Sequence, residues 1–393
     1  MKNEIILAGG MRTPFGDFGK SLKDISGTEL AAHAAKACLD DLKLSPNEVD
    51  HLVLGNVIPV DQGGYFSSRV VALESGLSIE SRALNVSRAC GSGVQAIISA
   101  AEQIATGHSS VALAGGYENF SRAPYLSSDI RWGAKRGPVS LIDSLDYAYR
   151  DPFDLQLMGD TAESVAQQYG YTREEMDGWA QLSQERAAMA IESGVLANQI
   201  SPIHVPERKG KRLFSVDEYP KQTTLEKLAQ LKPAFHHQGT VTAGNASGIT
   251  DGAAFTLVAD RVSAEKHGIK PRARIVDWSI VGVEPRIMGI APVPAIEQLL
   301  AQNNLKVSDI DYYEINEAFA VVNLHAERQL GISREITNLY GGGISIGHPP
   351  GATGVRMTMM AMQHLEAING RYAIISMCLG AGQGMAMLIE RLP

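Results

Sequence analysis

The stretch EVDHLVL at residues 48–54 returns, 261 residues later, as DIDYYEI at residues 309–315. In both places two acidic residues flank an apolar residue, just before a run that is typical of a buried β-strand. A second pair, VALA at 111–114 and AIIS at 373–376, matches at an offset of 262 residues. Two matches at nearly one spacing predict a duplicated fold; the competing explanation is chance, because buried strands resemble one another.

The chain around these repeats alternates strand-like and helix-like segments, as in α/β proteins with largely parallel sheets. The middle differs, with helical patterns, polar stretches and a charged hairpin turn at 207–212. We therefore expect a first α/β repeat at 1–120, completed by about 239–270, an inserted loop domain at 121–238, and a second repeat at 271–393.

Composition narrows the class of protein. The 393 residues include 35 basic and 43 acidic side chains, a net charge of −8 that argues against a general nucleic-acid or anionic-membrane surface. No apolar run approaches the ~18 residues of a membrane span, and the first ten residues do not form a signal peptide. Three scattered cysteines suit a reducing, cytoplasmic setting without disulfides. No metal-site spacing or Walker loop is present, so we expect neither a metal nor a cofactor.

The first candidate site is Cys90-Gly91-Ser92-Gly93. It follows a short strand-like stretch and precedes an amphipathic segment with Val94, Ile97 and Ile98 at helical spacing. A cysteine just ahead of a helix N-terminus meets free amides and the positive end of the helix dipole, which favour a thiolate nucleophile. The competing interpretation is a buried structural cysteine.

The second candidate is His348, set between glycines and prolines at residues 341–354. A histidine in such a fixed, accessible loop suits a general base for a thiol, although it could also only cap backbone groups. The same stretch contains Gly343-Ile344-Ser345-Ile346-Gly347, which matches a serine nucleophile elbow. Pro349 and Pro350 follow too closely for the helix that this elbow requires.

Three further clusters have mixed indications. Cys378, at the end of a predicted strand and ahead of Gly380 and Gly382, reads as a second reactive cysteine more than as a nucleotide loop. Asn316 and Glu317 follow another predicted strand, a usual place for sites in α/β folds. Residues 239–248 are small and polar, and fit either close packing on a ligand or a tight loop between domains.

Together these motifs resemble the thiolase family, over essentially the whole chain. The likeness runs through residues 12–16, 90–93, 239–248, 288–289, 316–319, 347–349 and Cys378. It implies a duplicated five-layer αβαβα fold with a loop domain inserted between the repeats. It also implies an acetyl-CoA C-acyltransferase that uses ping-pong catalysis, either condensing acyl-CoA with acetyl-CoA or cleaving a short 3-oxoacyl-CoA with coenzyme A.

The resemblance assigns roles to five positions. Cys90 is the nucleophile that becomes acylated, and His348 deprotonates it. Cys378 moves the proton at the substrate α-carbon. Asn316 holds a water that forms one oxyanion hole with His348, and the amides of Cys90 and Gly380 form a second. Coenzyme A then acts as substrate and product, and no metal or redox cofactor is required.

The resemblance also assigns coenzyme A contacts. The positions that match the pantetheine channel are Leu231, Phe235, Ala243, Ser247, Gly248, Met288 and Phe319. Lys221 stands where related chains place a cation near the nucleotide end, although a solvated surface lysine is the simpler interpretation. Leu157 stands where close relatives often have His, and Ala381 replaces a common glycine, so the preferred acyl length stays open.

The sequence leaves two alternative functions open and also makes one prediction about the oligomeric state. A condensing enzyme acting on a carrier protein would pair its cysteine with two histidines, and here Asn316 and Cys378 hold those places. A non-catalytic thiolase-like scaffold would have lost catalytic residues, and none is lost. Residues 126–145 resemble a tetramerisation loop, so we expect a homo-oligomer, a dimer or a tetramer of dimers.

Overall fold

The computed structural model describes residues 4–393. Its largest element is a ten-stranded sheet, with strands in the order β12-β13-β14-β11-β1-β10-β5-β3-β4 and β2 paired to β10. The half contributed mainly by the first third of the chain contains β1 (Ile5–Arg12), β2 (Gly16–Asp17), β3 (His51–Gly55), β4 (Arg82–Val86), β5 (Val111–Glu118) and β10 (Thr250–Asp260). The other half contains β11 (Ala273–Gly282), β12 (Tyr312–Ile315), β13 (Tyr372–Leu379) and β14 (Gln383–Arg391).

The two halves repeat one another in register. In the first half His51 of β3 lies opposite Ala112 of β5, and in the second Tyr312 of β12 lies opposite Ala373 of β13. Both residues of the second pair follow their counterparts by 261 positions, and both strand pairs are parallel. The halves meet through β1 and β11, where Ile6 pairs with Arg274 and Leu7 with Ala273.

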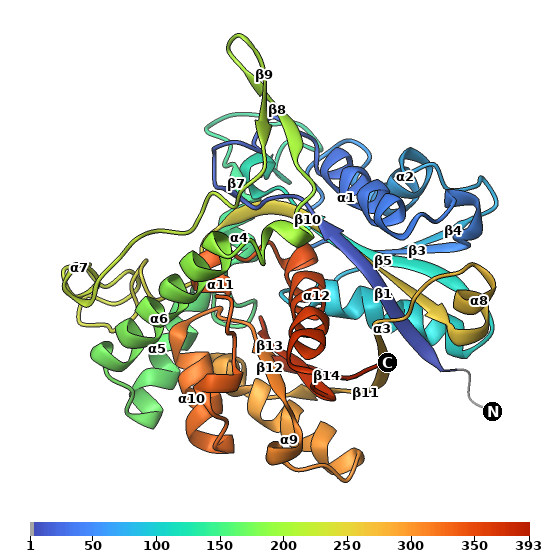
Figure 1. Cartoon of the computed structure of the whole chain (residues 1–393). Coiled ribbons are helices and arrows are strands. Elements are labelled where there is room, and N and C mark those ends of the chain that lie inside the picture. Colours follow the sequence, from blue (N-terminus) through green and yellow to red (C-terminus); the bar gives the residue numbers. More distant parts are fainter. Residues whose placement is uncertain (1–3) are drawn as a thin grey trace.

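Helices complete five layers (Figure 1). The outer layer of the first half contains α1 (Gly27–Leu42) and α2 (Ser67–Glu74), and the outer layer of the second contains α9 (Pro292–Gln302) and α10 (Ala320–Leu330). Between the half-sheets α3 (Ser92–Ala105) packs against α12 (Pro350–Ile368), which also contacts β5, β10 and β13. The expected duplicated αβαβα architecture is therefore confirmed.

One expectation about the sheet was wrong. Parallel pairing is confined to β3–β4, β3–β5 and β12–β13, while β1–β10, β10–β5, β11–β14 and β13–β14 are antiparallel. The reason is visible at β13 and β14, which are joined by a three-residue turn. So short a connection can only reverse the chain, whereas parallel neighbours need a longer crossover.

Residues 121–238 lie outside the large sheet. Their elements are β6 (Tyr125–Leu126), β7 (Ile142–Asp143), α4 (Ser144–Ala148), α5 (Met158–Tyr169), α6 (Arg173–Glu192), β8 (Ile203–Glu207), β9 (Gly210–Phe214) and α7 (Leu225–Ala229). Helix α6 starts with a capping box, because Thr172 accepts from the Glu175 amide and Glu175 accepts from the Thr172 amide. The charged turn at 207–212 forms the protruding β8–β9 hairpin (Figure 1).

A buried ion pair anchors this hairpin to the sheet. The Arg12 guanidinium donates to both oxygens of Asp217, at 2.6 and 2.7 Å, and the Phe15 amide donates to the same carboxylate at 2.8 Å.

Among residues 4–393, none of the helices has both the length and the apolar character needed to cross a membrane. Over the same range, no three potential metal-binding side chains form a cluster. The two remaining α-helices of the described residues are α8 (Arg261–Lys266) and α11 (Gly343–Ile346).

Candidate active site

Cys90 lies between β4 and α3, on a sharp turn at the helix N-terminus. Ala89 just before it has φ 43°, in the left-handed region that is costly for a residue with a side chain. The Ser92 hydroxyl holds the turn by donating to the Ala89 carbonyl at 2.8 Å and accepting from the Arg88 amide at 3.0 Å. The turn therefore presents the sulfur ahead of the helix, as the sequence predicts.

The amides of Gly380 and of Cys90 itself point at the Cys90 sulfur. They favour the thiolate, but burial opposes them more strongly and raises the pKa of Cys90 to about 11. The resting cysteine is thus a thiol, and a base would have to accept its proton for the sulfur to act as a nucleophile. The two amides that face the sulfur are also placed to donate to the oxyanion of an acyl group attached to that sulfur.

Arg88 connects the two loops that supply these amides. Its Nε donates to Gln95 on α3 at 2.6 Å, and one terminal nitrogen donates to Gln383 at the start of β14 at 3.2 Å. Gly91 lets the loops approach, because a Cβ there would lie 2.7 Å from Leu379 Cδ2. The first and second halves of the fold therefore meet at the Cys90 turn.

His348 precedes α12 and is only 4% exposed. Its Nδ1 lies 2.8 Å from Thr353 Oγ1, whose own proton goes to the Pro349 carbonyl at 2.9 Å. A hydroxyl that donates elsewhere accepts here, so Nδ1 carries the proton and Nε2 is the free base. Burial lowers the pKa of His348 to about 3, with the nearby Arg356 charge adding to the effect. The imidazole is neutral at rest.

Asn316 follows β12 directly and contacts the second ring nitrogen of His348, Nε2. Its Nδ2 lies 3.3 Å from His348 Nε2, and its backbone amide donates to Ser376 on β13 at 2.9 Å. Asn316 Oδ1 is buried and has no hydrogen-bond partner among residues 4–393. An amide oxygen in this state is a suitable acceptor for a bound water.

Cys378, near the end of β13, is fully buried. Burial raises the pKa of this thiol, and the nearby Cys90 sulfur raises it further. After Cys378, Gly380 leads into a turn in which Ala381 adopts φ 65° and Gly382 φ 75°. Two thiols from opposite halves of the fold therefore lie close enough for the charge of one to influence the other.

A channel-like pocket of about 540 Å³ lies between the inserted segment, residues 234–249 and Phe319 of the second half. Of the expected coenzyme A contacts, it is lined by Phe235, Ala243, Ser247, Gly248 and Phe319. The rings of Phe235 and Phe319 meet edge to face, with centroids 6.4 Å apart. Gly159 is required beneath Phe235, because any Cβ there would overlap the phenyl ring.

The structure places three expected contacts outside this lining. Met288 is buried in the core of the second half, and Leu231 is 39% exposed, near Gly244. Lys221 lines a neighbouring surface hollow, with its Nζ 4.4 Å from the centre of the Tyr219 ring. Tyr219 itself lines the channel, so Lys221 lies one side chain away from it.

Sequence reasoning missed several residues of the site. Tyr149 lines the channel, packs edge to face on Phe120 and lies near enough to Cys90 for the sulfur to influence its pKa. Thr353 fixes the His348 tautomer, and a hydroxyl five residues after the histidine was an available signal. Nothing local marks Tyr149, because only the fold brings it to Cys90. Ser345, the serine of the apparent nucleophile elbow, is buried in α11, where its hydroxyl contacts Ser183 and accepts from the Gly342 amide.

Comparisons with known proteins identify the family of the chain. Residues 5–262 match the thiolase N-terminal domain, and residues 269–391 match the thiolase C-terminal domain. The chain is 43% identical to beta-ketothiolase BktB of Cupriavidus necator, with all of both chains covered. It is 41% identical to the human mitochondrial 3-ketoacyl-CoA thiolase, with 98% of each covered.

Solved structures give the same result. A structure of the human mitochondrial 3-ketoacyl-CoA thiolase in complex with CoA superposes with a TM-score of 0.96 at 40% identity, covering 99% of this chain and 98% of that one. The acetyl-CoA acetyltransferase of Bacillus anthracis also gives 0.96 at 40% identity, covering 100% and 99%. The chain belongs to the thiolase family and is an acyltransferase.

Proposed function

We propose that the protein is an acetyl-CoA C-acyltransferase that works on short 3-oxoacyl-CoA thioesters through an acyl-Cys90 intermediate. The observation that carries this proposal is the close approach of α3 and α12 at Gly93 and Gly351, next to Cys90 and His348, with Asn316 Nδ2 3.3 Å from His348 Nε2. It brings three groups into one region: the Cys90 thiol with its two amides, the unprotonated Nε2 of His348, and Asn316 with a free amide oxygen. Each group matches one requirement of acyl transfer: a nucleophile, a base and donors for oxyanions.

In the first half-reaction Cys90 Sγ gives its proton to His348 Nε2 and attacks the thioester carbonyl carbon. The amides of Cys90 and Gly380 hold the oxyanion of the tetrahedral intermediate. When the carbon–sulfur bond to coenzyme A breaks, the departing thiolate takes the proton of the Cys378 thiol, so Cys378 becomes a thiolate and His348 Nε2 keeps the proton from Cys90. An acyl group remains on Cys90, because a thiolate is both a good nucleophile and a good leaving group.

In the second half-reaction the Cys378 thiolate removes a proton from the α-carbon of acetyl-CoA. A water on Asn316 Oδ1 and the protonated Nε2 of His348 donate to the enolate oxygen, and the α-carbon attacks the acyl group on Cys90. The Cys90 thiolate leaves and takes back its proton from His348 Nε2, and the product is a 3-oxoacyl-CoA. Thiolysis runs through the same steps in reverse.

Coenzyme A would occupy the channel lined by Phe235, Ala243, Ser247, Gly248 and Phe319. We include Leu231 because its side chain approaches Gly244, next to Ala243 of the lining, and Lys221 because it lies over Tyr219. Met288 is included on the family resemblance alone. The name of the human structure in complex with CoA supports this choice of ligand. The lining is mainly apolar, as suits a pantetheine arm, and the Cys90-Gly91-Ser92-Gly93 motif favours short acyl groups.

The proposal includes a homo-oligomer, a dimer or a tetramer of dimers, acting in the cytoplasm. Two exposed apolar surfaces support self-association. One surrounds the edge strand β4 and includes Tyr65, Phe66 and Ile79, each more than 70% exposed. The other lies in the inserted segment and includes Trp132, 91% exposed. Light scattering coupled to size exclusion measures the mass of the assembly.

The test of the proposed function is a thiolysis assay on purified protein. Acetoacetyl-CoA and 3-oxopentanoyl-CoA are each mixed with coenzyme A, and loss of the 3-oxoacyl-CoA is followed. We expect turnover of both substrates by the wild-type protein and none above background by Cys90→Ala. Folded protein that cleaves neither substrate but accepts acyl groups on a carrier protein would contradict the proposal.

A further inference from the structure

Glu317 follows Asn316 in the chain, and its carboxylate is buried, at 1% exposure. Oε1 accepts from Trp179 Nε1 at 3.1 Å and from Asn338 Nδ2 at 3.2 Å. Oε2 accepts from Ser183 Oγ at 2.6 Å and from the Ile344 amide at 3.2 Å. All four donors are neutral, and within residues 4–393 no cationic side chain lies within ion-pair distance of Glu317. A buried carboxylate held in this way restrains every segment that donates to it.

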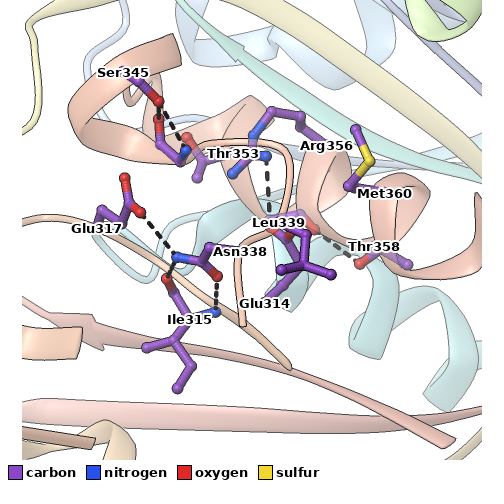
Figure 2. A network of polar contacts seen from close by, with 12 residues as sticks. Glu314, Ile315, Glu317, Asn338, Leu339, Ser345, Thr353, Arg356, Thr358 and Met360 are labelled. Atoms are coloured by element: carbon purple, nitrogen blue, oxygen red, sulfur yellow. Dashed lines mark hydrogen bonds and ion pairs between the residues drawn. The ribbon is translucent and has the colours of Figure 1, made fainter. Parts of the chain in front are cut away.

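These donors come from three separate parts of the chain. Trp179 and Ser183 belong to α6, and Ile344 belongs to α11 in the loop that leads to His348. Asn338 completes the third link, because its side chain also bonds both the amide and the carbonyl of Ile315, at 2.9 and 2.7 Å. Figure 2 shows Asn338 between Glu317 and Ile315, the last residue of β12 before Asn316.

The loop that leads to His348 wraps closely around Glu317. A Cβ on Gly342 would overlap the Glu317 carboxyl group, and one on Gly343 would lie 2.7 Å from the Glu317 carbonyl oxygen. Ser183 also lies 2.8 Å from Ser345 Oγ, which accepts from the Gly342 amide. Glu317 therefore restrains Asn316 through the chain and His348 through this loop.

The contact between these two catalytic groups tolerates little displacement. Asn316 Nδ2 and His348 Nε2 are 3.3 Å apart, already near the limit of a hydrogen bond. We propose that Glu317 is a positioning residue that sets the separation of Asn316 and His348, and with it the oxyanion hole for the coenzyme A thioester. This inference rests on the proposed function, in which those two groups stabilise the enolate.

The test compares Glu317→Gln with the wild-type protein. The amide is the same size, but it replaces one acceptor oxygen with a donor that faces two donors, so the α11 loop shifts. We expect kcat for thiolysis of acetoacetyl-CoA to fall 10- to 100-fold, with KM within twofold. Ser183→Ala removes one donor, and we expect kcat to fall three- to tenfold with KM again within twofold. This variant serves as the test if Glu317→Gln does not fold. The control is Asp50→Asn. The Asp50 carboxylate accepts from Ser109 and Ser110 at the opposite strand ends, and its replacement leaves kcat within twofold of the wild type.

A double-mutant cycle separates positioning from a general loss of structure. If Glu317 acts through the Asn316–His348 pair, Glu317→Gln costs less than twofold in kcat when Asn316 is already Ala. The same 10- to 100-fold loss in that background overturns the inference. Full activity of Asn316→Ala alone would instead contradict the proposed function, so the two failures are distinguishable.

Discussion

Cys90 and His348 occupy corresponding places in the two halves, because each lies two residues before the first residue of a central helix, α3 or α12. The helices meet at these ends. A Cβ on Gly93 would lie 2.7 Å from the Gly351 carbonyl oxygen, and one on Gly354 would lie 2.6 Å from the Val94 amide. The duplicated fold thus brings the two helix N-termini next to Cys90 and His348 together by crossing them at glycines.

This crossing predicts the effect of a single methyl group. Gly93→Ala pushes α3 and α12 apart, and we expect it to lower the free energy of unfolding by about 1–3 kcal/mol and thiolysis more than tenfold. Gly178→Ala in α6 is the matched control, because a Cβ there meets no atom within 4 Å. It should stabilise the protein by about 0.5–1 kcal/mol. Urea denaturation measures both, and an unchanged Gly93→Ala protein would refute the crossing argument.

The hydroxyl of Thr353 predicts a second loss. Thr353→Val keeps the shape but removes the acceptor for His348 Nδ1–H, so the imidazole no longer keeps Nε2 as the free base. We expect kcat/KM for acetoacetyl-CoA to fall 10- to 100-fold, while Thr353→Ser, which retains the hydroxyl, stays within threefold of the wild type. Equal activity of the Val and Ser variants would show that the hydroxyl does not set the tautomer.

The pKa values of the resting site predict how Cys90 reacts with pH. Burial raises the pKa of Cys90 to about 11 and lowers that of His348 to about 3, so both groups are neutral between these values. Raising the pH towards 11 increases the thiolate fraction. Iodoacetamide should therefore alkylate the free protein faster at each step from pH 7 to 9, and Cys90→Ser should not react on that timescale. A constant rate between pH 6 and 9 would instead indicate a preformed thiolate–imidazolium pair.

The anchor of the inserted segment predicts a loss of stability. Arg12 and Asp217 form an ion pair in which both side chains are 0% exposed. Asp217→Ala leaves the arginine charge buried without a partner, which costs about 3–5 kcal/mol. Asp24→Ala breaks the exposed pair with Lys23, 2.7 Å apart, and should change stability by at most about 1 kcal/mol. Similar losses from the two variants in urea denaturation would argue against the anchor.

The repeat and the main motifs were readable from the sequence because they depend on local chemistry. Buried strands carry continuous apolar runs, so the match of residues 48–54 with 309–315 indicated the duplication. Cys90 was placed at a helix N-terminus from glycines and periodicity alone. The antiparallel pairing of β13 and β14 was missed although its signal is local, because only residues 380–382 separate the two strands.

The missed residues depend on distant contacts. Tyr149 reaches the Cys90 region from the inserted segment, and no spacing in the chain relates the two. Trp179 and Ser183 reach Glu317 across 138 and 134 positions, which only the folded arrangement reveals. The channel lining shows the same limit, since Phe235 and Phe319 line it while Met288 lies in the core.

The central claim is that Cys90 carries the acyl group. Intact-mass spectrometry of the protein mixed with acetyl-CoA tests it most directly, with Cys90→Ser treated in parallel. We expect one added acetyl group on the wild-type protein, mapped to Cys90 by peptide analysis, and none on the variant. An acetyl group that maps to another residue, or folded protein that gains none from any acyl-CoA, would contradict it.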